Sequence, residues 1–300
     1  MDIKKCKIFV LTTETENISK TADLTGYTQS AISHMLKSME KETGIQLFVR
    51  DRYGVHPTPV ARELLPHINA LLNENEKVEQ FIYDLHGLEV GTLTIGTFSS
   101  IALHLLPDIF RDFSTSHPNI SFNIKEGGSD DLERWTVDNE VDFCLYSQNQ
   151  NSPLQFFPLT KDPIVAVLPP DFPLLKGQTS VPIQMFDKRP FIISQAGIEY
   201  DIHRALNEAG ITPNVRYSSK DDKTIIAMVE HGLGAAMLPK LSTNNAPADV
   251  LNLPLDPPYS RTLGIGIKDT KNAAPLTKLF IRYILNHFHS DYPDPFPTGK

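Results

Sequence analysis

Residues 17–50 read NISKTADLTGYTQSAISHMLKSMEKETGIQLFVR, and this stretch decides the N-terminal fold. Asn17 and Ser19 are residue types that cap helix N-termini, so a short helix is predicted to start after one of them. The helix ends at Gly26, because glycine adopts the left-handed conformation of a helix C-cap at little cost. A second helix follows after a tight turn. Two helices around such a turn are typical of the helix-turn-helix motif, whose second helix lies in the DNA major groove.

The second predicted helix is capped by Thr28, runs to about Thr43 and ends at Gly44. Its apolar residues recur at helical spacing and are predicted to face a core; they are Ile32, Met35, Leu36 and Met39. The opposite face carries Gln29, Ser30, Ser33, His34 and Lys37. An amide can contact adenine bidentately, hydroxyls reach base edges or phosphate, and a cation binds guanine or phosphate. A polar helix face is often only a solvated surface, but the helix-turn-helix pattern around this one favours DNA contact.

This stretch closely resembles the LysR-type transcriptional regulators of bacteria. The matching residues are Phe9, ISKTA at 18–22, QSAIS at 29–33, Met39-Glu40, GIQLFVR at 44–50, and Pro57-Thr58. The resemblance implies a winged helix-turn-helix domain at residues 1–58, with its wing at 50–56. His34 stands where the family more often has arginine, and Val60-Ala61 departs from the family pattern at the start of the next helix. The predicted DNA contacts are Ser19, Thr28, Gln29, Ser30, Ser33, His34, Lys37, Arg50 and Arg52.

The charge of the chain is unevenly distributed. Residues 1–60 carry eight Lys/Arg and seven Asp/Glu, a net of +1, whereas the whole chain of 300 residues has a net charge of −8. The acidic residues therefore lie mainly outside the predicted DNA-binding domain. Because that domain is only weakly basic, we expect modest nonspecific DNA affinity and a need for two copies of the domain.

The composition and the lack of targeting signals favour a cytoplasmic protein. The length allows two or three domains, and the hydrophobic content of 40% is ordinary for a globular protein. The two cysteines, Cys6 and Cys144, form no CxxC pair, which argues against a disulfide framework or zinc site. Both are predicted to be buried. The N-terminus lacks signal-peptide features, and no segment approaches the roughly 20 apolar residues of a membrane helix.

A long helix is predicted over residues 59–87, with Thr58 as its cap and Pro59 at its first position. Its seam residues are spaced alternately by four and three: Leu64, Ile68, Leu71, Asn75, Val78, Ile82 and Leu85. This heptad pattern predicts helix pairing, with Asn75 favouring one register, and the equivalent linker helix of the LysR family pairs two subunits. An amphipathic helix packed on its own domain is the alternative. Pro66 removes one helix hydrogen bond and is expected to disturb the first turns.

From residue 91 the pattern becomes strand-helix-strand, which predicts an α/β fold with a mostly parallel sheet. One helix is predicted from Ser99-Ser100 through Phe113. GTLTIG at 91–96, VDF at 141–143 and GLGAAMLP at 232–239 resemble the LysR effector domain, which has the type 2 periplasmic-binding-protein fold. The resemblance implies a domain at 91–290, with lobe one at 91–162 and 268–290 and lobe two at 163–267. The tail at 291–300 is predicted to be disordered.

The predicted effector-binding residues follow strands or begin helices, since ligands of such sheets lie at the carboxyl ends of strands. They are Ser99, Ser100, Ser147, Gln195 and Thr224. The hydroxyls of Ser99 and Ser100, with free backbone N–H groups at a helix start, suit an anion such as a carboxylate. Plain helix capping is the alternative interpretation of these residues.

Other site types find no support in the sequence. No phosphate loop, Rossmann fingerprint or HExxH occurs, and His287 with His289 is too few ligands for a metal site. No cofactor, metal or catalytic residue is therefore predicted. Peroxide-sensing members of the LysR family carry a cysteine pair in lobe two, and this chain has no cysteine there. We favour a transcription regulator that binds double-stranded DNA and a small effector, with a homotetramer expected from the resemblance alone. The alternative is a small-molecule binding or transfer protein whose N-terminal helices only mediate assembly.

Overall fold

A computed structural model of the chain describes residues 2–51, 54–85, 90–149, 151–174, 177–198, 200–289 and 293–296. The chain divides into two compact units, the first reaching residue 88 and the second comprising most of residues 89–300. No helix of the described part is both long and apolar enough to cross a bilayer.

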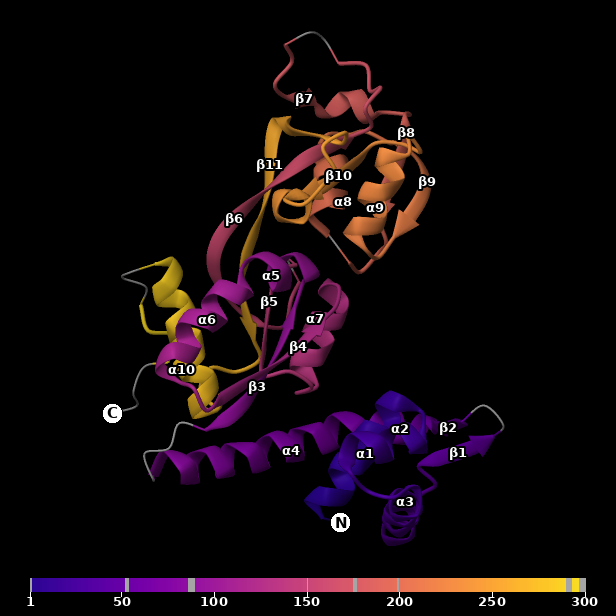
Figure 1. Cartoon of the computed structure of the whole chain (residues 1–300), viewed down its shortest axis with the longest axis vertical. Coiled ribbons are helices and arrows are strands. Elements are labelled where there is room, and N and C mark those ends of the chain that lie inside the picture. Colours follow the sequence, from indigo (N-terminus) through magenta and orange to yellow (C-terminus); the bar gives the residue numbers. More distant parts are fainter. Residues whose placement is uncertain are drawn as a thin grey trace. The chain divides into compact units, whose positions relative to one another are not determined.

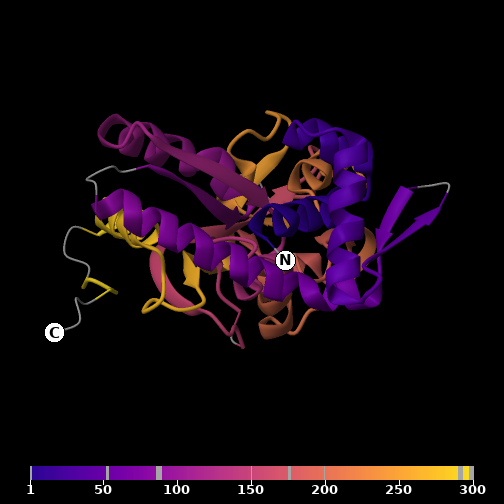
Figure 2. The same cartoon turned by 90° about the horizontal axis from the view of Figure 1, so that it is seen from below.

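The first unit is a bundle of three helices with a β-hairpin and a long fourth helix. Its elements are α1 (Ile3–Thr15), α2 (Ile18–Thr25), α3 (Gln29–Thr43), β1 (Phe48–Asp51), β2 (Gly54–Pro57) and α4 (Pro59–Leu85). The Asn17 side chain accepts from the Lys20 N–H at 3.0 Å, and Thr28 Oγ1 accepts from the Ala31 N–H at 3.2 Å. Gly26 and Gly44 end α2 and α3 with φ of 70° and 71°. The predicted helix-turn-helix is thereby confirmed, and the hairpin extends away from the helices (Figure 1; Figure 2).

The long helix α4 is continuous through Pro66, but only part of its predicted seam is exposed. Ile68 is 2% exposed and half-buried Leu64 packs beside it, both in the core of the first unit with residues of α1 and α3. For these two residues the prediction of a pairing seam is therefore wrong, because α4 begins by packing on its own domain. Leu71, Val78 and Ile82 are 42%, 58% and 47% exposed. The Leu85 side chain lies outside the described residues, and Asn75 Nδ2 donates to Glu79 Oε1 at 2.9 Å.

The second unit is built on one long mixed sheet. The strand order is β10-β6-β11-β5-β3-β4, and β7 pairs with β11. Lobe one contains β3 (Gly91–Thr97), α5 (Ser99–His104), α6 (Leu106–Ser116), β4 (Ile120–Glu126), α7 (Ser129–Val137), β5 (Phe143–Ser147) and α10 (Pro275–Phe288). β3 is parallel to both β4 and β5, and a core of apolar side chains that includes Phe113, Phe143 and Phe280 fills this lobe.

Lobe two carries its own smaller cores. Its elements are β7 (Val181–Pro182), η1 (Ile183–Phe186), β8 (Pro190–Ser194), α8 (Tyr200–Glu208), β9 (Asn214–Ser219), α9 (Asp222–Glu230), β10 (Ala236–Pro239) and η2 (Lys240–Thr243). Two long antiparallel strands, β6 (Gln155–Leu168) and β11 (Leu251–Ile267), run from one lobe into the other (Figure 1). We call them the crossover strands.

Three expectations for this unit are corrected. The sheet is not mostly parallel, because β11 pairs antiparallel with both β5 and β6, and β10 pairs antiparallel with β6. The single helix predicted from Ser99 is two helices, α5 and α6, with a break at Leu105. Pro107 lacks the N–H that a continuous helix would need there, and it is favoured in the first turn of the new helix α6. The predicted disordered tail is wrong for residues 293–296, because Phe296 is 5% exposed in the lobe-one core and its carbonyl accepts from Arg282 Nη2 at 2.9 Å. The other residues of the tail lie outside the described part.

Candidate functional site

Helix α3 presents the polar flank predicted from the sequence. Its buried residues are Ile32, Leu36 and Met39, which anchor it to the bundle. Of the predicted DNA contacts on this helix and its cap, Thr28, Gln29, Ser30, His34 and Lys37 are exposed and Ser33 is half-buried. Ser19 on α2 and Arg50 on β1 are also exposed, whereas Arg52 lies outside the described residues. An apolar-anchored helix with an exposed amide, hydroxyls and a cation has the composition that reads base edges and phosphates.

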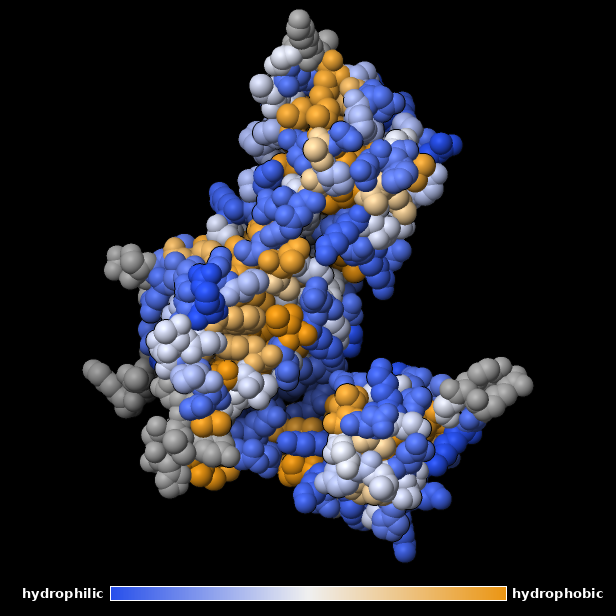
Figure 3. Space-filling view, in the orientation of Figure 1, coloured by the Kyte–Doolittle hydropathy of each residue, from blue (hydrophilic) through white to orange (hydrophobic). Residues whose placement is uncertain are grey.

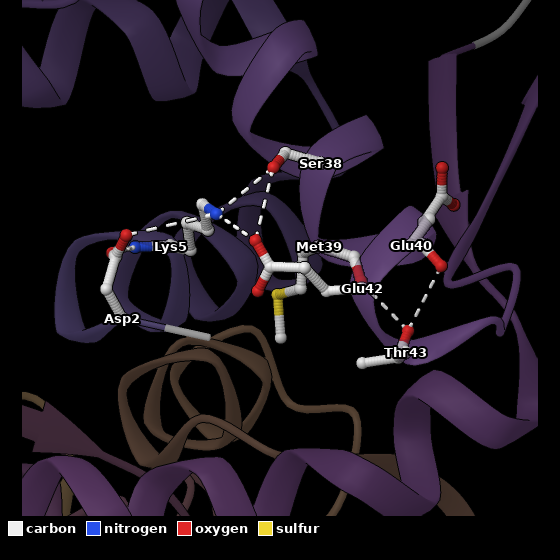
Figure 4. Close-up of polar contacts among 7 residues, drawn as sticks. All are labelled: Asp2, Lys5, Ser38, Met39, Glu40, Glu42 and Thr43. Atoms are coloured by element: carbon white, nitrogen blue, oxygen red, sulfur yellow. Dashed lines mark hydrogen bonds and ion pairs between the residues drawn. The ribbon is translucent and has the colours of Figure 1, made fainter.

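The C-terminal half of α3 is fixed to α1 by a polar network (Figure 4). Lys5 on α1 donates to Ser38 Oγ at 3.1 Å and pairs with Glu42, while Ser38 also donates to Glu42 at 3.3 Å. The hydrogen bond from Lys5 lowers the pKa of Glu42 to about 2. Figure 4 also shows Thr43 donating to the carbonyls of Met39 and Glu40 at the end of the helix. These contacts hold the orientation of α3 in the bundle.

The hairpin is anchored to the helices by two carboxylates. Glu40 Oε1 on α3 accepts from the N–H groups of Leu47 and Phe48 at 2.9 and 3.0 Å, which fixes the entry into β1. Glu16, the left-handed C-cap of α1, accepts from Val55 through its carbonyl at 3.2 Å. Its Oε2 lies 2.6 Å from Nδ1 of His56 on β2.

His56 is a titratable residue in the contact between the hairpin and the helices. Its Nε2 lies 3.5 Å from Asp51 Oδ1, so the ring stands between two carboxylates, and Arg62 Nη2 is 3.4 Å from Glu16 Oε1. The hydrogen bond with Glu16 and the nearby charges of Asp51 and Glu16 raise the pKa of His56 above its usual value. The wing of this domain is therefore held most firmly when His56 is protonated.

A cavity of about 510 Å³ lies between the two lobes of the second unit. Lobe one contributes residues of α5, the end of β4 and the loop before α7, including Ser99, Ser100 and Glu126. Lobe two contributes the start of α9 and Ser242 of η2, and crossover strand β11 contributes Arg261. The lining contains acidic and basic side chains, so it suits a polar ligand.

One buried ion pair reaches this cavity through Arg261. Arg261 on β11 and Asp162 on β6 are register partners on the crossover strands, and each side chain is 1% exposed. Arg261 Nη2 lies 2.9 Å and Nε 3.0 Å from Asp162 Oδ2, while Oδ1 of Asp162 accepts from the Leu241 N–H at 3.1 Å. Arg261 Nη2 also donates to Ser100 Oγ at 3.0 Å. The pair therefore links both crossover strands to α5 of lobe one and η2 of lobe two.

The predicted effector-binding residues separate into two groups. Ser99 and Ser100 line the cavity, but the other three lie outside its lining. Ser147 Oγ donates to Asp201 Oδ2 at 2.5 Å, and Thr224 Oγ1 donates to Asp221 Oδ2 at 2.7 Å. Thr224 thus helps Asp221 cap α9, as the capping alternative describes.

Gln195 also lies outside the cavity lining, and its backbone N–H donates to the carbonyl of Ser219 at 3.0 Å. The prediction of a cavity position is therefore wrong for Ser147, Gln195 and Thr224.

The sequence reasoning missed Asp162, Arg261 and Asp222. Asp162 and Arg261 each stand two residues before an apolar run, IVAVL at 164–168 and LGIGI at 263–267. A charged residue at the same offset in both strands was the available signal, but only the antiparallel register shows that the two meet. Asp222 begins α9, and burial raises the pKa of its carboxyl.

Metal and thiol chemistry gain no support from the geometry. Among the described residues, no group of three or more His, Cys, Asp or Glu side chains could hold a metal ion. Cys6 and Cys144 are both buried, as predicted, and burial raises the pKa of the Cys144 thiol to about 12.

Comparison with known proteins decides the family. Residues 3–62 match the family model of the bacterial regulatory helix-turn-helix proteins of the lysR family, and residues 86–289 match the LysR substrate binding domain. The chain belongs to the LysR family of bacterial transcriptional regulators. This LysR-type regulator thus combines a winged helix-turn-helix with a two-lobed effector-binding domain, as the sequence predicted. The alternative of a binding or transfer protein without DNA contact is not favoured.

Individual relatives agree with this assignment. The HTH-type transcriptional regulator YvbU of Bacillus subtilis is 30% identical over 94% of this chain and 97% of its own. The effector binding domain of QuiR in complex with shikimate has a TM-score of 0.63 at 21% identity, covering 68% of this chain and all of that one. Full-length CbnR complexed with its target DNA has a TM-score of 0.68 at 14% identity, covering 95% and 99%. At these identities the two structures establish the fold alone.

Proposed function

We propose that this LysR-type regulator reads DNA through the exposed flank of α3, with Gln29 and His34 toward base edges and Lys37 toward phosphate or guanine. The single observation that carries the proposal is the separation of faces on α3: Ile32, Leu36 and Met39 are buried, while Gln29, His34 and Lys37 are exposed. The wing supplies Arg50, and Ser19, Thr28, Ser30, Ser33 and Arg52 complete the proposed contacts. CbnR, which shares the fold, has been seen with its target DNA.

We further propose that the chain acts as a homo-oligomer in the cytoplasm, without enzymatic activity. The exposed apolar residues Leu71, Val78, Phe81 and Ile82 lie on the C-terminal part of α4, and apolar surface is visible along this helix in Figure 3. Two such helices pairing would bring two DNA-binding domains to one dyad-symmetric site. The family resemblance favours a tetramer built from two of these pairs, and the relative YvbU is a transcriptional regulator.

The proposed effector is a small molecule with an acidic group, bound in the cavity between the lobes. Ser99 and Ser100 line that cavity, and the effector domain of QuiR, which shares the fold, binds shikimate. A ligand that binds one arrangement of the lobes better than another shifts the populations of the two, and so can change the spacing of the DNA-binding domains.

A salt titration tests the DNA part of the proposal. The affinity of the full chain for duplex DNA should fall with salt, and Lys37→Ala should reduce the salt slope by about one. Gln29→Ala should cost about 1–3 kcal/mol on a specific site if the amide contacts a base. Lys271→Ala is the matched control, because Lys271 is exposed on the second unit. Equal behaviour of all three variants would contradict the proposal.

A further inference from the structure

Two serines that line the cavity have opposite hydrogen-bonding roles. Ser100 belongs to α5 of lobe one, and Ser242 belongs to η2 of lobe two. Both line the cavity. A hydroxyl has one proton to donate and two lone pairs that accept, so its existing partner determines what a ligand can still offer it.

The Ser100 hydroxyl acts as a hydrogen-bond acceptor toward Arg261. Its Oγ accepts from Arg261 Nη2 at 3.0 Å, and a guanidinium has donors only. The hydroxyl proton of Ser100 makes no other hydrogen bond with the described residues. Ser100 is 8% exposed, so this proton has little access to bulk water. It is available for a ligand group that accepts, and donation from the charged Arg261 strengthens it as a donor.

The Ser242 hydroxyl acts as a hydrogen-bond donor toward Asp222. Its Oγ donates to Asp222 Oδ2 at 2.6 Å, so its oxygen can only accept from a ligand. The second carboxyl oxygen of Asp222 makes no hydrogen bond with the described residues. Burial raises the pKa of Asp222, and a cationic donor beside it would stabilise its charged form. This end of the cavity therefore offers two acceptors, the Ser242 oxygen and the second Asp222 oxygen, and a cationic donor would match both.

The two ends are close together because one ion pair joins them. Arg261 contacts Ser100, and its partner Asp162 accepts from Leu241, the residue next to Ser242. One small molecule can therefore reach both ends. The lining charges that form no ion pair within the described part have both signs: Glu126, Asp221 and Asp222 are acidic, and Lys220 and Lys223 are basic. A ligand that carries both signs of charge can therefore find an opposite charge for each of them in this cavity.

We propose that the effector is a small amino acid, whose carboxylate accepts from Ser100 and whose ammonium group donates to Ser242 and Asp222. This inference rests on the proposed function, which places the effector in this cavity. It adds to the acidic group already proposed a second, cationic group with its own recognition site.

Tryptophan fluorescence of the full chain provides the assay. Trp135 is the single tryptophan, and its ring packs on Gly127 of the cavity lining, where an added Cβ would lie 2.5 Å from the ring. The probes are three matched series: alanine, lactate and propionate; aspartate, malate and succinate; phenylalanine, phenyllactate and phenylpropionate. In at least one series the amino acid should bind at least about tenfold more tightly than the deaminated acid, which leaves the acceptors of Ser242 and Asp222 unpaired.

Three variants separate the two ends. Ser242→Ala should abolish most of the preference for the amino acid over the deaminated acid, and Ser100→Ala should weaken both to a similar extent. Ser116→Ala is the matched control, because Ser116 is exposed at the end of α6 and lies outside the cavity lining. The inference is overturned if no amino acid binds, if the deaminated acid binds as tightly, or if Ser242→Ala keeps the preference. Salt-dependent DNA binding of the same preparations shows whether the proposed function itself stands.

Discussion

Substitution of Asp162 by asparagine should destabilise the effector domain far more than its conservative size suggests. Asp162 and Arg261 are each 1% exposed and lie 2.9 Å apart, so the substitution removes the carboxylate charge next to a buried guanidinium. Removing one partner of a buried ion pair costs about 3–5 kcal/mol. Because the amide oxygen of the introduced asparagine could still accept from Arg261, we expect the lower end, about 3 kcal/mol.

Urea unfolding followed by tryptophan fluorescence measures this loss. Trp135 is the only tryptophan and belongs to the effector domain, so the signal reports unfolding of that domain. With a urea m-value of about 2–3 kcal/mol/M, a loss of about 3 kcal/mol lowers the midpoint by about 1–1.5 M. Adding Arg261→Met should recover much of the shift, since the buried guanidinium charge is then absent.

The control is Asp108→Asn, which removes the same charge from an ion pair of similar geometry at the surface. Asp108 lies 2.8 Å from Arg111, and both side chains are 68% exposed. Exposed pairs contribute little because water screens them, so the midpoint should stay unchanged. If Asp162→Asn shifted the midpoint no more than Asp108→Asn, the structural role given to the buried pair would be refuted.

Three further predictions concern the wing, the tail and assembly. The carboxylates of Glu16 and Asp51 raise the pKa of His56, so its stabilisation of the wing is complete below the ordinary histidine pKa of about 6.5 and is lost as pH rises through the raised value. Fluorescence anisotropy at constant salt should show DNA affinity falling over that rise, and His56→Gln should flatten this dependence; identical profiles would contradict it. Phe296→Ala removes a side chain that is 5% exposed and should cost about 3 kcal/mol in the urea assay, whereas an unstructured tail would give no shift. Ile82→Asp places a charge in the exposed apolar stripe of α4 and should lower the mass measured by light scattering, and an unchanged mass would exclude Ile82 from the interface.

The sequence was most informative where the signals are local. Asn17 and Thr28 cap their helices through contacts three residues along the chain, and the glycines that end these helices act on the same short range. The periodicity of α3 assigned its buried and exposed faces for the same reason. These features together identified the helix-turn-helix without knowledge of any distant contact.

The prediction failed where distant residues decide the outcome. Ile68 fits a heptad seam, but its burial depends on the packing of α4 against helices earlier in the chain. Arg261 and Asp162 are separated by 99 residues and meet only through the register of the crossover strands. Ser147 follows a strand as a cavity residue would, yet its hydroxyl bonds Asp201, a partner that no local pattern indicates.

Footprinting of the full chain on the DNA upstream of its own gene tests the central claim most directly. If the exposed flank of α3 reads bases, the protein should protect two half-sites about one helical turn, or a multiple of it, apart. Gln29→Ala and Lys37→Ala should lose this protection at the same protein concentration while Lys271→Ala retains it. Protection that is indifferent to both α3 variants would contradict the account.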